Sequence, residues 1–362
     1  MGRKDVVLHP GQQVAWESDR RFVALIAGTG GGKALGVDTP VPTPSGFVKM
    51  GSIEVGDLVF TPYGRSTRVT YVSPIYAHNK CYRVSFDDGS CLVADADHRW
   101  WTQTANDRKN AARSINKNWE GSVKTTEEIA GTLMAGCRTN HSIDLPAPVE
   151  YSNKQLPIPP YTLGAWLGDG TSTCADITSA DDEVLEEIRK EGVRVGVGRD
   201  TNSGAAHGYR LGGSKIRGGN EHVITHGRNT LQGMLRSLGL LGNKHIPDNY
   251  LMGSVAQRHA LLAGLLDTDG YCAADGEIVF TSKLEGLAKQ VLLLTRSLGI
   301  KCRIRIKKVN GGVYYDVHFT TDISVFKLRR KLLRQSSQCD PRVRRLFITK
   351  VEEIPPEKVR CI

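Results

Sequence analysis

The spacing of hydrophobic and polar residues changes along this chain and divides it into segments. Residues 22–27 form an apolar run with the length of a buried strand, and a glycine cluster follows it. From Val41 to about residue 150, turn signals separate short β-type runs, which include DLVF, TRVTYVSP, KCYRVSF and SCLVADA. This spacing predicts an all-β segment. The stretch LPIPP at 156–160 then predicts a linker.

Beyond residue 160 the helical period returns. The stretches at 180–192 and 281–299 predict amphipathic helices that end at a glycine. Tyr161–Leu167 and Arg258–Leu266 predict two more helices, and each of these leads into an acidic glycine turn. The β-type runs EIVF, CRIRI and VYYDVHF lie among them. This segment is predicted to be α+β, with a weak internal duplication.

Composition and charge narrow the classes of protein that fit. The 362 residues leave room for two or three domains of roughly 150 residues each. The start carries no apolar signal core, and no apolar run reaches about 18 residues, so we expect a cytoplasmic chain without a membrane span. The eight cysteines form no CxxC pair, which favours reduced thiols.

The net charge of +10 is uneven along the chain. Basic clusters occur late, at Lys301–Lys308, Lys327–Arg334 and Arg342–Arg345. One such cluster is equally well a solvated surface. Three in one region favour a polyanion partner, most simply double-stranded DNA.

Two related acidic turns are the first candidate for chemistry. LGAWLGDG at 163–170 and LAGLLDTDG at 262–270 each place small residues among large ones on a helix, with an Asp before a Gly. Small residues allow two helices to approach closely, which would bring Asp169 and Asp269 together. Two neighbouring carboxylates repel unless a cation lies between them, and hard oxygen ligands favour Mg²⁺. A single turn of this kind is more often a helix C-cap.

LAGLLDTDG resembles the LAGLIDADG motif of homing endonucleases, and LGAWLGDG resembles its degenerate first copy. Lys244, in NKHIP, is similar to the lysine between the two motifs in intein endonucleases. The resemblance implies that Asp169 and Asp269 bind metal and that Lys244 stabilises charge during phosphodiester cleavage. It also implies a monomer with duplicated αββαββα repeats and pseudo-twofold symmetry, which binds duplex DNA on a saddle of strands. A surface lysine is the alternative for Lys244, and an inactive DNA-binding protein of the same fold is the alternative for the whole domain.

Two further motifs lie before the predicted nuclease segment, ALGVDTPVPTPSG at 34–46 and GSCLVADADHRWWT at 89–102. The first is similar to the opening block of an intein, a protein-splicing element, and the second to its second block, which contains His98. The resemblance covers residues 34–362. It implies an all-β, horseshoe-shaped Hint splicing domain whose N-terminal part is 34–155, an endonuclease domain at 156–345, and the start of the C-terminal Hint part at 346–362.

Two departures from most inteins favour the class 3 subgroup. Ala34 carries no nucleophile where most inteins begin with Cys or Ser, and Asp95 stands where the second block usually has Thr. Class 3 inteins begin with a non-nucleophile, carry a Trp two residues after the block's His, and use an internal Cys. Trp100 and Cys361 match these positions. Two alternatives remain for Ala34: a Cys replaced to block splicing, or a subgroup in which the residue after the intein attacks directly.

The class 3 resemblance implies a reaction at the Lys33–Ala34 bond. The Cys361 thiolate would attack the Lys33 carbonyl and form a thioester, and His98 would donate a proton to the leaving Ala34 nitrogen. Trp100 would shape the pocket, and Asp95 would orient His98. A hydrogen-bonded strand histidine and a core tryptophan are the alternatives for His98 and Trp100.

In the first 33 residues, HPGQQ at 9–13 precedes AGTGGGK, a phosphate-binding Walker A loop that lacks only its final Ser or Thr. These two stretches together resemble the start of a phage terminase large subunit, an ATP-driven DNA-packaging enzyme. Gly28, Gly30, Gly32 and Lys33 would hold ATP phosphates once splicing restores the following helix. A terminase fragment is therefore an alternative for the whole chain, although we expect no ATPase activity from the unspliced form.

The sequence ends at Ile362 without the closing His-Asn of an intein and without the Thr that class 3 members use. We therefore expect that this chain does not splice unaided and needs a missing C-terminal intein segment supplied in trans. A gene fragment, half of a split pair and a decayed element are all compatible with this pattern.

Overall fold

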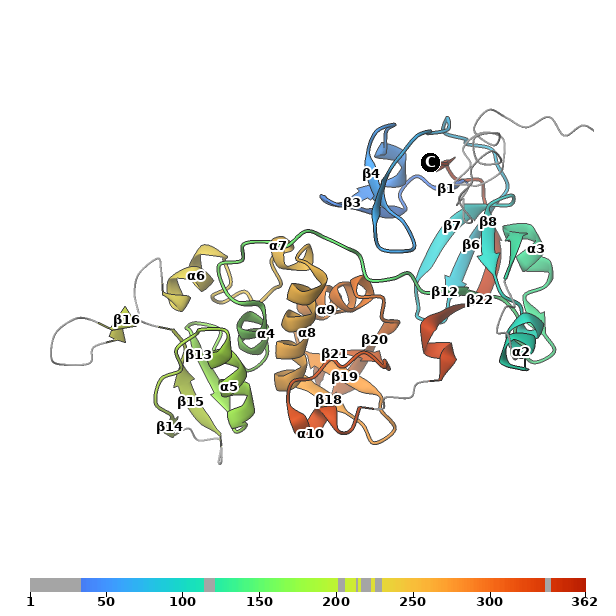
Figure 1. Ribbon diagram of the computed structural model, residues 1–362. Coiled ribbons are helices and arrows are strands. Elements are labelled where there is room, and N and C mark those ends of the chain that lie inside the picture. The colour runs from blue at the N-terminus through green and yellow to red at the C-terminus, as the bar shows by residue number, and fades with distance from the viewer. Residues whose placement is uncertain are drawn as a thin grey trace, which may run out of the picture. The chain divides into compact units, whose positions relative to one another are not determined.

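The computed structural model describes residues 34–113, 121–200, 206–212, 214–215, 223–224, 230–335 and 340–362 (Figure 1). The chain forms two compact units, one made of residues up to Phe60, Ser66–Asp144 and Leu346–Ile362, the other of Thr61–Arg65 and Leu145–Arg345. The predicted phosphate loop, with Gly28, Gly30, Gly32 and Lys33, lies outside the described residues.

The first unit is mainly β-structure. Its strands are β1 (Leu35–Gly36), β2 (Pro40–Thr43), β3 (Gly46–Lys49), β4 (Leu58–Phe60), β5 (Ser66–Arg68), β6 (Cys81–Phe86), β7 (Cys91–Asp95), β8 (Arg99–Thr102), β9 (Ser122–Thr125), β10 (Met134–Ala135), β11 (Arg138–Thr139), β12 (Ser142–Asp144), β22 (Arg345–Ile354) and β23 (Val359–Arg360). Six of them form one sheet in the order β12-β22-β6-β7-β1-β23, which joins strands from both ends of the described chain. This sheet positions Ala34, Asp95 and Cys361.

The predicted all-β character of residues 41–150 is wrong in two places. Helix α2 (Ala105–Arg113) and helix α3 (Thr126–Gly131) interrupt the strands. A capping box starts α3, because the Thr125 side chain accepts from the Glu128 N–H while the Glu128 side chain accepts from the Thr125 N–H. Of the predicted β-type run TRVTYVSP, only the first two residues belong to a strand, because β5 ends at Arg68.

The second unit mixes helices and strands. Its helices are α4 (Pro160–Asp169), α5 (Asp182–Lys190), α6 (Leu231–Ser237), α7 (Asp248–Leu251), α8 (Val255–Asp269), α9 (Glu285–Ser297) and α10 (Arg329–Leu332). Its strands are β13 (Asp176–Ser179), β14 (Arg199–Asp200), β15 (His207–Arg210), β16 (Ser214–Lys215), β17 (Val223–Ile224), β18 (Gly270–Cys272), β19 (Ile278–Ser282), β20 (Cys302–Val309) and β21 (Gly312–Phe319). The two larger sheets run β13-β15-β14 and β18-β19-β21-β20.

Helices α4 and α8 lie side by side at the centre of this unit (Figure 1). Their facing side chains belong to one buried core, together with α9 and the inner faces of the strands. The helices predicted at 161–167 and 258–266 are confirmed, as are the strands of EIVF, CRIRI and VYYDVHF. Those predicted at 180–192 and 281–299 are also present but shorter, as α5 and α9, and residues 281–282 belong to β19 instead.

The stretch LPIPP is packed rather than an open linker. Ile158 is fully buried, and its backbone N–H and carbonyl both bond to the Tyr250 hydroxyl. Within the described part of the chain, no helix has the length and apolar character needed to cross a membrane.

Candidate active sites

Glycines set the close contact between α4 and α8. A Cβ atom at Gly164 would lie 2.2 Å from the Leu261 carbonyl oxygen, and one at Gly264 would lie 2.2 Å from the Tyr161 carbonyl oxygen. Neither backbone group can move without shifting a helix. The two helices therefore depend on residues without side chains at both positions.

Replacing Gly264 with Ala is expected to lower the free energy of unfolding by about 1–3 kcal/mol, because the added methyl forces the helices apart. Urea denaturation measures this loss. Gly286→Ala is the matched control, since a Cβ there meets nothing within 4 Å and alanine is the better helix former. Equal stability of the two variants would contradict the packing argument.

The close packing brings Asp169 and Asp269 to the shared C-terminal ends of α4 and α8. A Cβ at Gly168, beside Asp169, would lie 3.5 Å from the Asp269 carboxyl carbon. Burial raises the pKa of Asp269 to about 6, with repulsion from Asp169 adding to the rise. Burial also raises the pKa of Asp169. Both side chains keep an exposed side, so an ion from solvent reaches the pair.

Two lysines bond to the ends of the same helices. The Lys244 ammonium donates to the Gly168 carbonyl over 2.8 Å and lies 5.3 Å from the centre of the Trp166 ring. The Lys331 ammonium is buried and donates to the carbonyls of Leu266, Asp267, Thr268 and Gly270, at the end of α8. Each ammonium lowers the pKa of both aspartates, against the effect of burial.

Lys331 corrects the interpretation of the basic run Lys327–Arg334 as a phosphate-binding cluster. Its side chain satisfies helix carbonyls instead of facing solvent, and burial lowers its pKa to about 8. Arg330 in the same run pairs with Asp181. Sequence pattern alone marks a lysine among arginines as exposed, so only the tertiary contact with α8 reveals this role.

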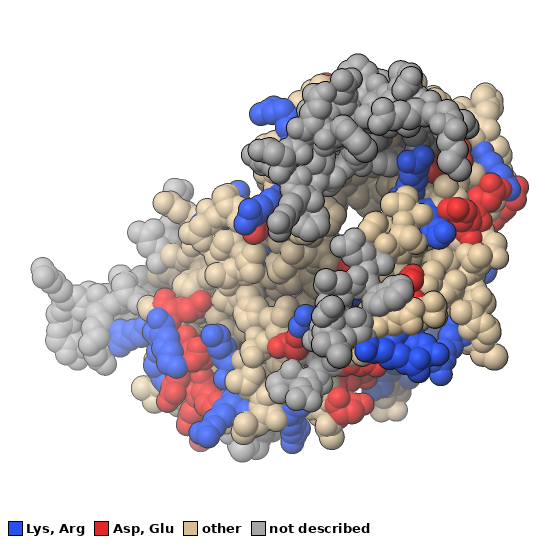
Figure 2. All heavy atoms as spheres, turned by 45° about the vertical axis from the view of Figure 1, so that its right-hand side comes forward, with Lys and Arg blue, Asp and Glu red and all other residues tan. Residues whose placement is uncertain are grey.

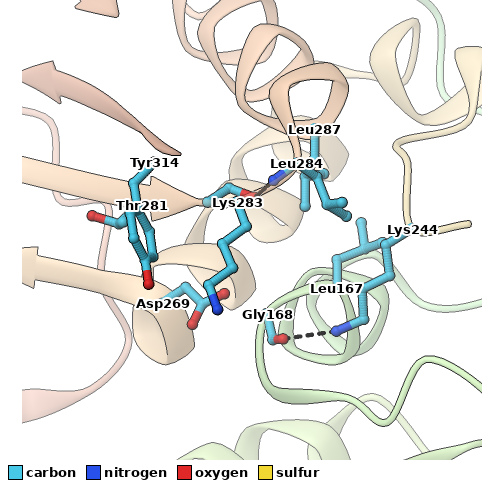
Figure 3. Close-up of a pocket in the computed structure, with 10 residues that line it drawn as sticks. Leu167, Gly168, Lys244, Asp269, Thr281, Lys283, Leu284, Leu287 and Tyr314 are labelled. Atoms are coloured by element: carbon cyan, nitrogen blue, oxygen red, sulfur yellow. Dashed lines mark hydrogen bonds between the residues drawn. The ribbon is translucent and has the colours of Figure 1, made fainter. Parts of the chain in front are cut away.

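A pocket of about 470 Å³ opens beside Asp269 (Figure 3). Gly168 and Lys244 line it from one side, and Thr281, Lys283 and Tyr314 from the other. In Figure 3 the Lys283 side chain extends toward Asp269. Lys283 was missed in the sequence because its stretch was interpreted only as a helix. Its position directly after a β-type run, in TSK, was the available signal.

The outer face of β20 and β21 is basic. Arg303, Arg305 and Lys307 alternate on β20 and are exposed, and they lie opposite His318, Asp316 and Tyr314 of β21. On the face drawn in Figure 2, the Lys and Arg side chains stand in several groups that alternate with acidic ones.

The second candidate site lies in the first unit, where β1 meets β7 and β23. The Asp95 N–H donates to the Ala34 carbonyl over 3.0 Å. Leu35 pairs with Arg360, and Gly36 pairs with Val359. Extending this antiparallel register by one residue places Ala34 opposite Cys361. Ser73 holds the Cys361 backbone, because its hydroxyl accepts from the Cys361 N–H and its own N–H donates to the Cys361 carbonyl.

His98 and Trp100 follow β7. Their ring centres lie 4.7 Å apart in an edge-to-face arrangement. Trp100 is buried in a cluster with Phe86 and Ile129, and its indole N–H donates to Thr126. Trp100 therefore has the core-packing role, and it also contacts the His98 ring. The Asp95 carboxylate accepts a hydrogen bond from the Asn79 side chain over 3.0 Å.

The described residues contain no group of three or more His, Cys, Asp or Glu side chains arranged to hold a metal ion. Asp169 and Asp269 nevertheless fit a divalent cation, since burial raises the pKa of both carboxyls, repulsion from Asp169 raises that of Asp269 further, and a bound cation would offset these effects. Magnesium sites often use one or two carboxylates together with substrate phosphates.

Binding of Mg²⁺ to this pair is expected to weaken below pH 6. The pKa of Asp269 is about 6 rather than 3.8, so the folded protein holds a proton there that the metal must displace as the pH falls. The apparent affinity then drops by up to about tenfold per pH unit. Isothermal titration from pH 5 to 7.5 measures this slope, and a constant affinity would contradict it.

Residues 256–337 match the family model described as a LAGLIDADG-like domain. The replicative DNA helicase DnaB of Mycobacterium intracellulare is 37% identical over 358 residues, which cover 94% of this chain and 57% of that protein. The chain thus spans little more than half the length of this curated relative.

Two solved structures are similar to separate parts of the chain. The Msm DnaB1 intein splicing domain, bound with zinc, is 38% identical and covers 29% of this chain and 68% of its own, with a TM-score of 0.22. Mesophilic variants of the homing endonuclease I-DmoI are 12% identical and cover 49% of this chain and 86% of their own, with a TM-score of 0.31. Residues 256–337 of the chain therefore form a LAGLIDADG-like domain.

Proposed function

We propose that this chain is an intein that carries a site-specific endonuclease for double-stranded DNA. The observation that carries the nuclease part is the pair Asp169 and Asp269, held by two helices whose packing admits no side chain at Gly164 or Gly264. The LAGLIDADG-like match at 256–337 contains one of these helices and supports the same function.

The basic strand face is proposed as the DNA-binding surface. Arg303, Arg305 and Lys307 project from the same side of β20, at the spacing of alternate strand residues. Phosphate contacts of this kind fix the position of a protein on DNA and supply much of its affinity. The neighbouring pocket places Lys283 and Tyr314 near Asp269.

Asp169 and Asp269 would hold Mg²⁺, which when bound activates a water molecule and stabilises the leaving oxygen. The protein itself supplies the remaining charges. Lys244 and Lys283 line the pocket beside Asp269, where the cleaved phosphate would lie. Lys331 keeps the end of α8 in place through its carbonyl contacts.

DNA that encodes the joined host sequence, without the insertion, tests the nuclease proposal. Homing acts on the uninterrupted gene, so the natural target is the set of codons on either side of the Lys33–Ala34 position. Linear DNA with this site should be cut in Mg²⁺ and remain intact in EDTA. The same DNA with the insertion present is the control, and failure to cut the empty site would count against the proposal.

We further propose class 3 splicing chemistry at the Lys33–Ala34 bond. The Cys361 thiolate attacks the Lys33 carbonyl carbon, the bond to the Ala34 nitrogen breaks as that nitrogen takes up a proton and leaves as an amine, and the acyl group becomes a thioester on Cys361. The supporting observation is the register that sets Cys361 opposite Ala34. A thioester is cleaved by hydroxylamine, so release of residues 1–33 from the intact chain tests this step.

The terminase host stays a proposal that rests on HPGQQ and the glycine loop of residues 1–33. The curated relatives are named replicative helicases, which makes a DnaB-type helicase the second candidate host. The gene sequence that flanks this coding segment distinguishes the two, because only one of these genes encodes the remainder of a helicase.

A further inference from the structure

Four strands place four residues in one row across the main sheet of the first unit. Cys81 of β6 pairs with Asp95 of β7, and Leu35 of β1 pairs with Ala94 of β7 and with Arg360 of β23. Continuing these antiparallel registers by one position sets Ala34 between Asp95 and Cys361. Directly opposite residues point to the same face of a sheet. Asp95 and Cys361 therefore flank Ala34 on one face, about 10 Å apart along two strand spacings.

This face is apolar around Asp95. Ala34, Cys81 and Val359 form one buried cluster, and Val93 and Ile354 pack against it. The Asp95 side chain is only 3% exposed. A carboxylate in such surroundings is disfavoured relative to the neutral acid.

One carboxyl oxygen of Asp95 is available for a chemical role. Its Oδ2 accepts from the Asn79 amide over 3.0 Å, whereas Oδ1 is buried and has no hydrogen-bond partner among the residues that the structure describes. Burial raises the pKa of the Asp95 carboxyl, and the Asn79 side chain together with the backbone N–H groups of Ala34 and His98, which face the carboxyl, offsets part of this rise. The Ala34 N–H belongs to the amide that splicing would break.

We propose that Asp95 is the acid that protonates the leaving Ala34 nitrogen, a role that rests on the proposed splicing reaction. The Cys361 thiolate adds to the Lys33 carbonyl, and the carbon–nitrogen bond then breaks. The Asp95 hydroxyl gives its proton to the Ala34 nitrogen, which leaves as an amine, and Asp95 is left as a carboxylate. Cys361 carries the acyl group as a thioester, so charge and atoms balance.

The assignment replaces an orienting role for Asp95 with a direct one. Asp95 bonds to Ala34 through its backbone and faces the Ala34 N–H through its carboxyl. The His98 ring packs against Trp100, and the backbone N–H of His98 faces the Asp95 carboxyl. Other ionisable groups around Asp95 are Cys81 on β6 and Asp97 in the turn after β7, and Asp97 opposes ionisation of Asp95.

The experiment uses the full chain with the missing C-terminal intein segment supplied in trans, adds hydroxylamine, and measures release of residues 1–33 by mass spectrometry over a pH series that covers the ionisation of both groups. Wild type should show a rate that rises as Cys361 ionises and falls as Asp95 loses its proton. Asp95→Asn keeps an acceptor for Asn79 but no acid, so the rate should drop by about 100-fold or more and the falling limb should vanish. Asp97→Asn, at an exposed neighbour, should keep both limbs.

The outcomes separate the two proposals. Release that depends on Cys361 but has the same rate and pH profile in Asp95→Asn as in wild type overturns the role of Asp95 and leaves splicing standing. Loss of the falling limb in His98→Ala, with Asp95→Asn unchanged, assigns the proton to His98 instead. Release that does not depend on Cys361, or no release at all, overturns both proposals.

Discussion

Replacing Asp269 with Asn should abolish Mg²⁺-dependent DNA cleavage, with a rate loss of at least about 100-fold. The asparagine side chain fills the same space but carries no charge, so the pair with Asp169 no longer attracts a divalent ion. The variant should be as stable as wild type or more stable without metal, because wild type must keep a partly buried carboxyl with a pKa of about 6 beside Asp169. Gel assays of cleavage and thermal unfolding measure the two effects.

Asp169→Asn should behave in the same way, since both carboxylates would hold the same ion in the proposed site. Asp275→Asn is the matched control, because Asp275 is exposed in the turn between β18 and β19. This substitution removes the same single negative charge as the two site variants. DNA affinity should change little in any of the three. If both site variants still cleave in Mg²⁺, the enzyme proposal fails. If wild type binds the target without cutting it, the inactive DNA-binding alternative is the better description.

The helix pair could be predicted from sequence because its signals are local. Alternating small and large residues and the Asp-Gly turns lie within two short stretches, and α4 and α8 both end at an Asp before a Gly. The helix at 281–299 and the strands of β19, β20 and β21 likewise follow from periodicity within single segments.

Roles that depend on contacts between distant segments could not be predicted in this way. Lys331 lies 61 residues from Gly270, the last carbonyl that it contacts, and its own run is basic on every side. Lys283 comes beside Asp269 only because β19 returns along β18. Helix α3 was missed although its capping box is readable as Thr125 and Glu128.

Asp95 illustrates the same limit in a sheet. Alternation along SCLVADA predicts the face to which Asp95 points, but it does not reveal which strands lie on either side. The strands on either side of Asp95 are β6 and β1. Those on either side of Ala34 are β7 and β23, and β23 lies near the C-terminal end of the chain. A role beside the Lys33–Ala34 amide follows only from this register.

Replacing Cys361 with Ala should eliminate the hydroxylamine-sensitive release of residues 1–33. In the proposed reaction the Cys361 thiolate is the nucleophile that forms the thioester, and the strand register sets Cys361 opposite Ala34. Cys361→Ser should lose most of the activity, because a hydroxyl is a much weaker nucleophile than a thiolate near neutral pH. Mass spectrometry identifies the released peptide and its modified C-terminus.

Cys81→Ala provides the control for this variant. Cys81 is a buried cysteine in the same cluster as Ala34, but it lies beyond Asp95, three strands away from Cys361. Its replacement should leave the rate of release within a fewfold of the wild-type rate. If removing any buried thiol had a general effect, release would fall equally in Cys81→Ala and Cys361→Ala. Release that survives in Cys361→Ala would mean that another group cleaves the Lys33–Ala34 bond. Ala34 would then mark an intein of a different subgroup, in which the residue after the intein attacks directly.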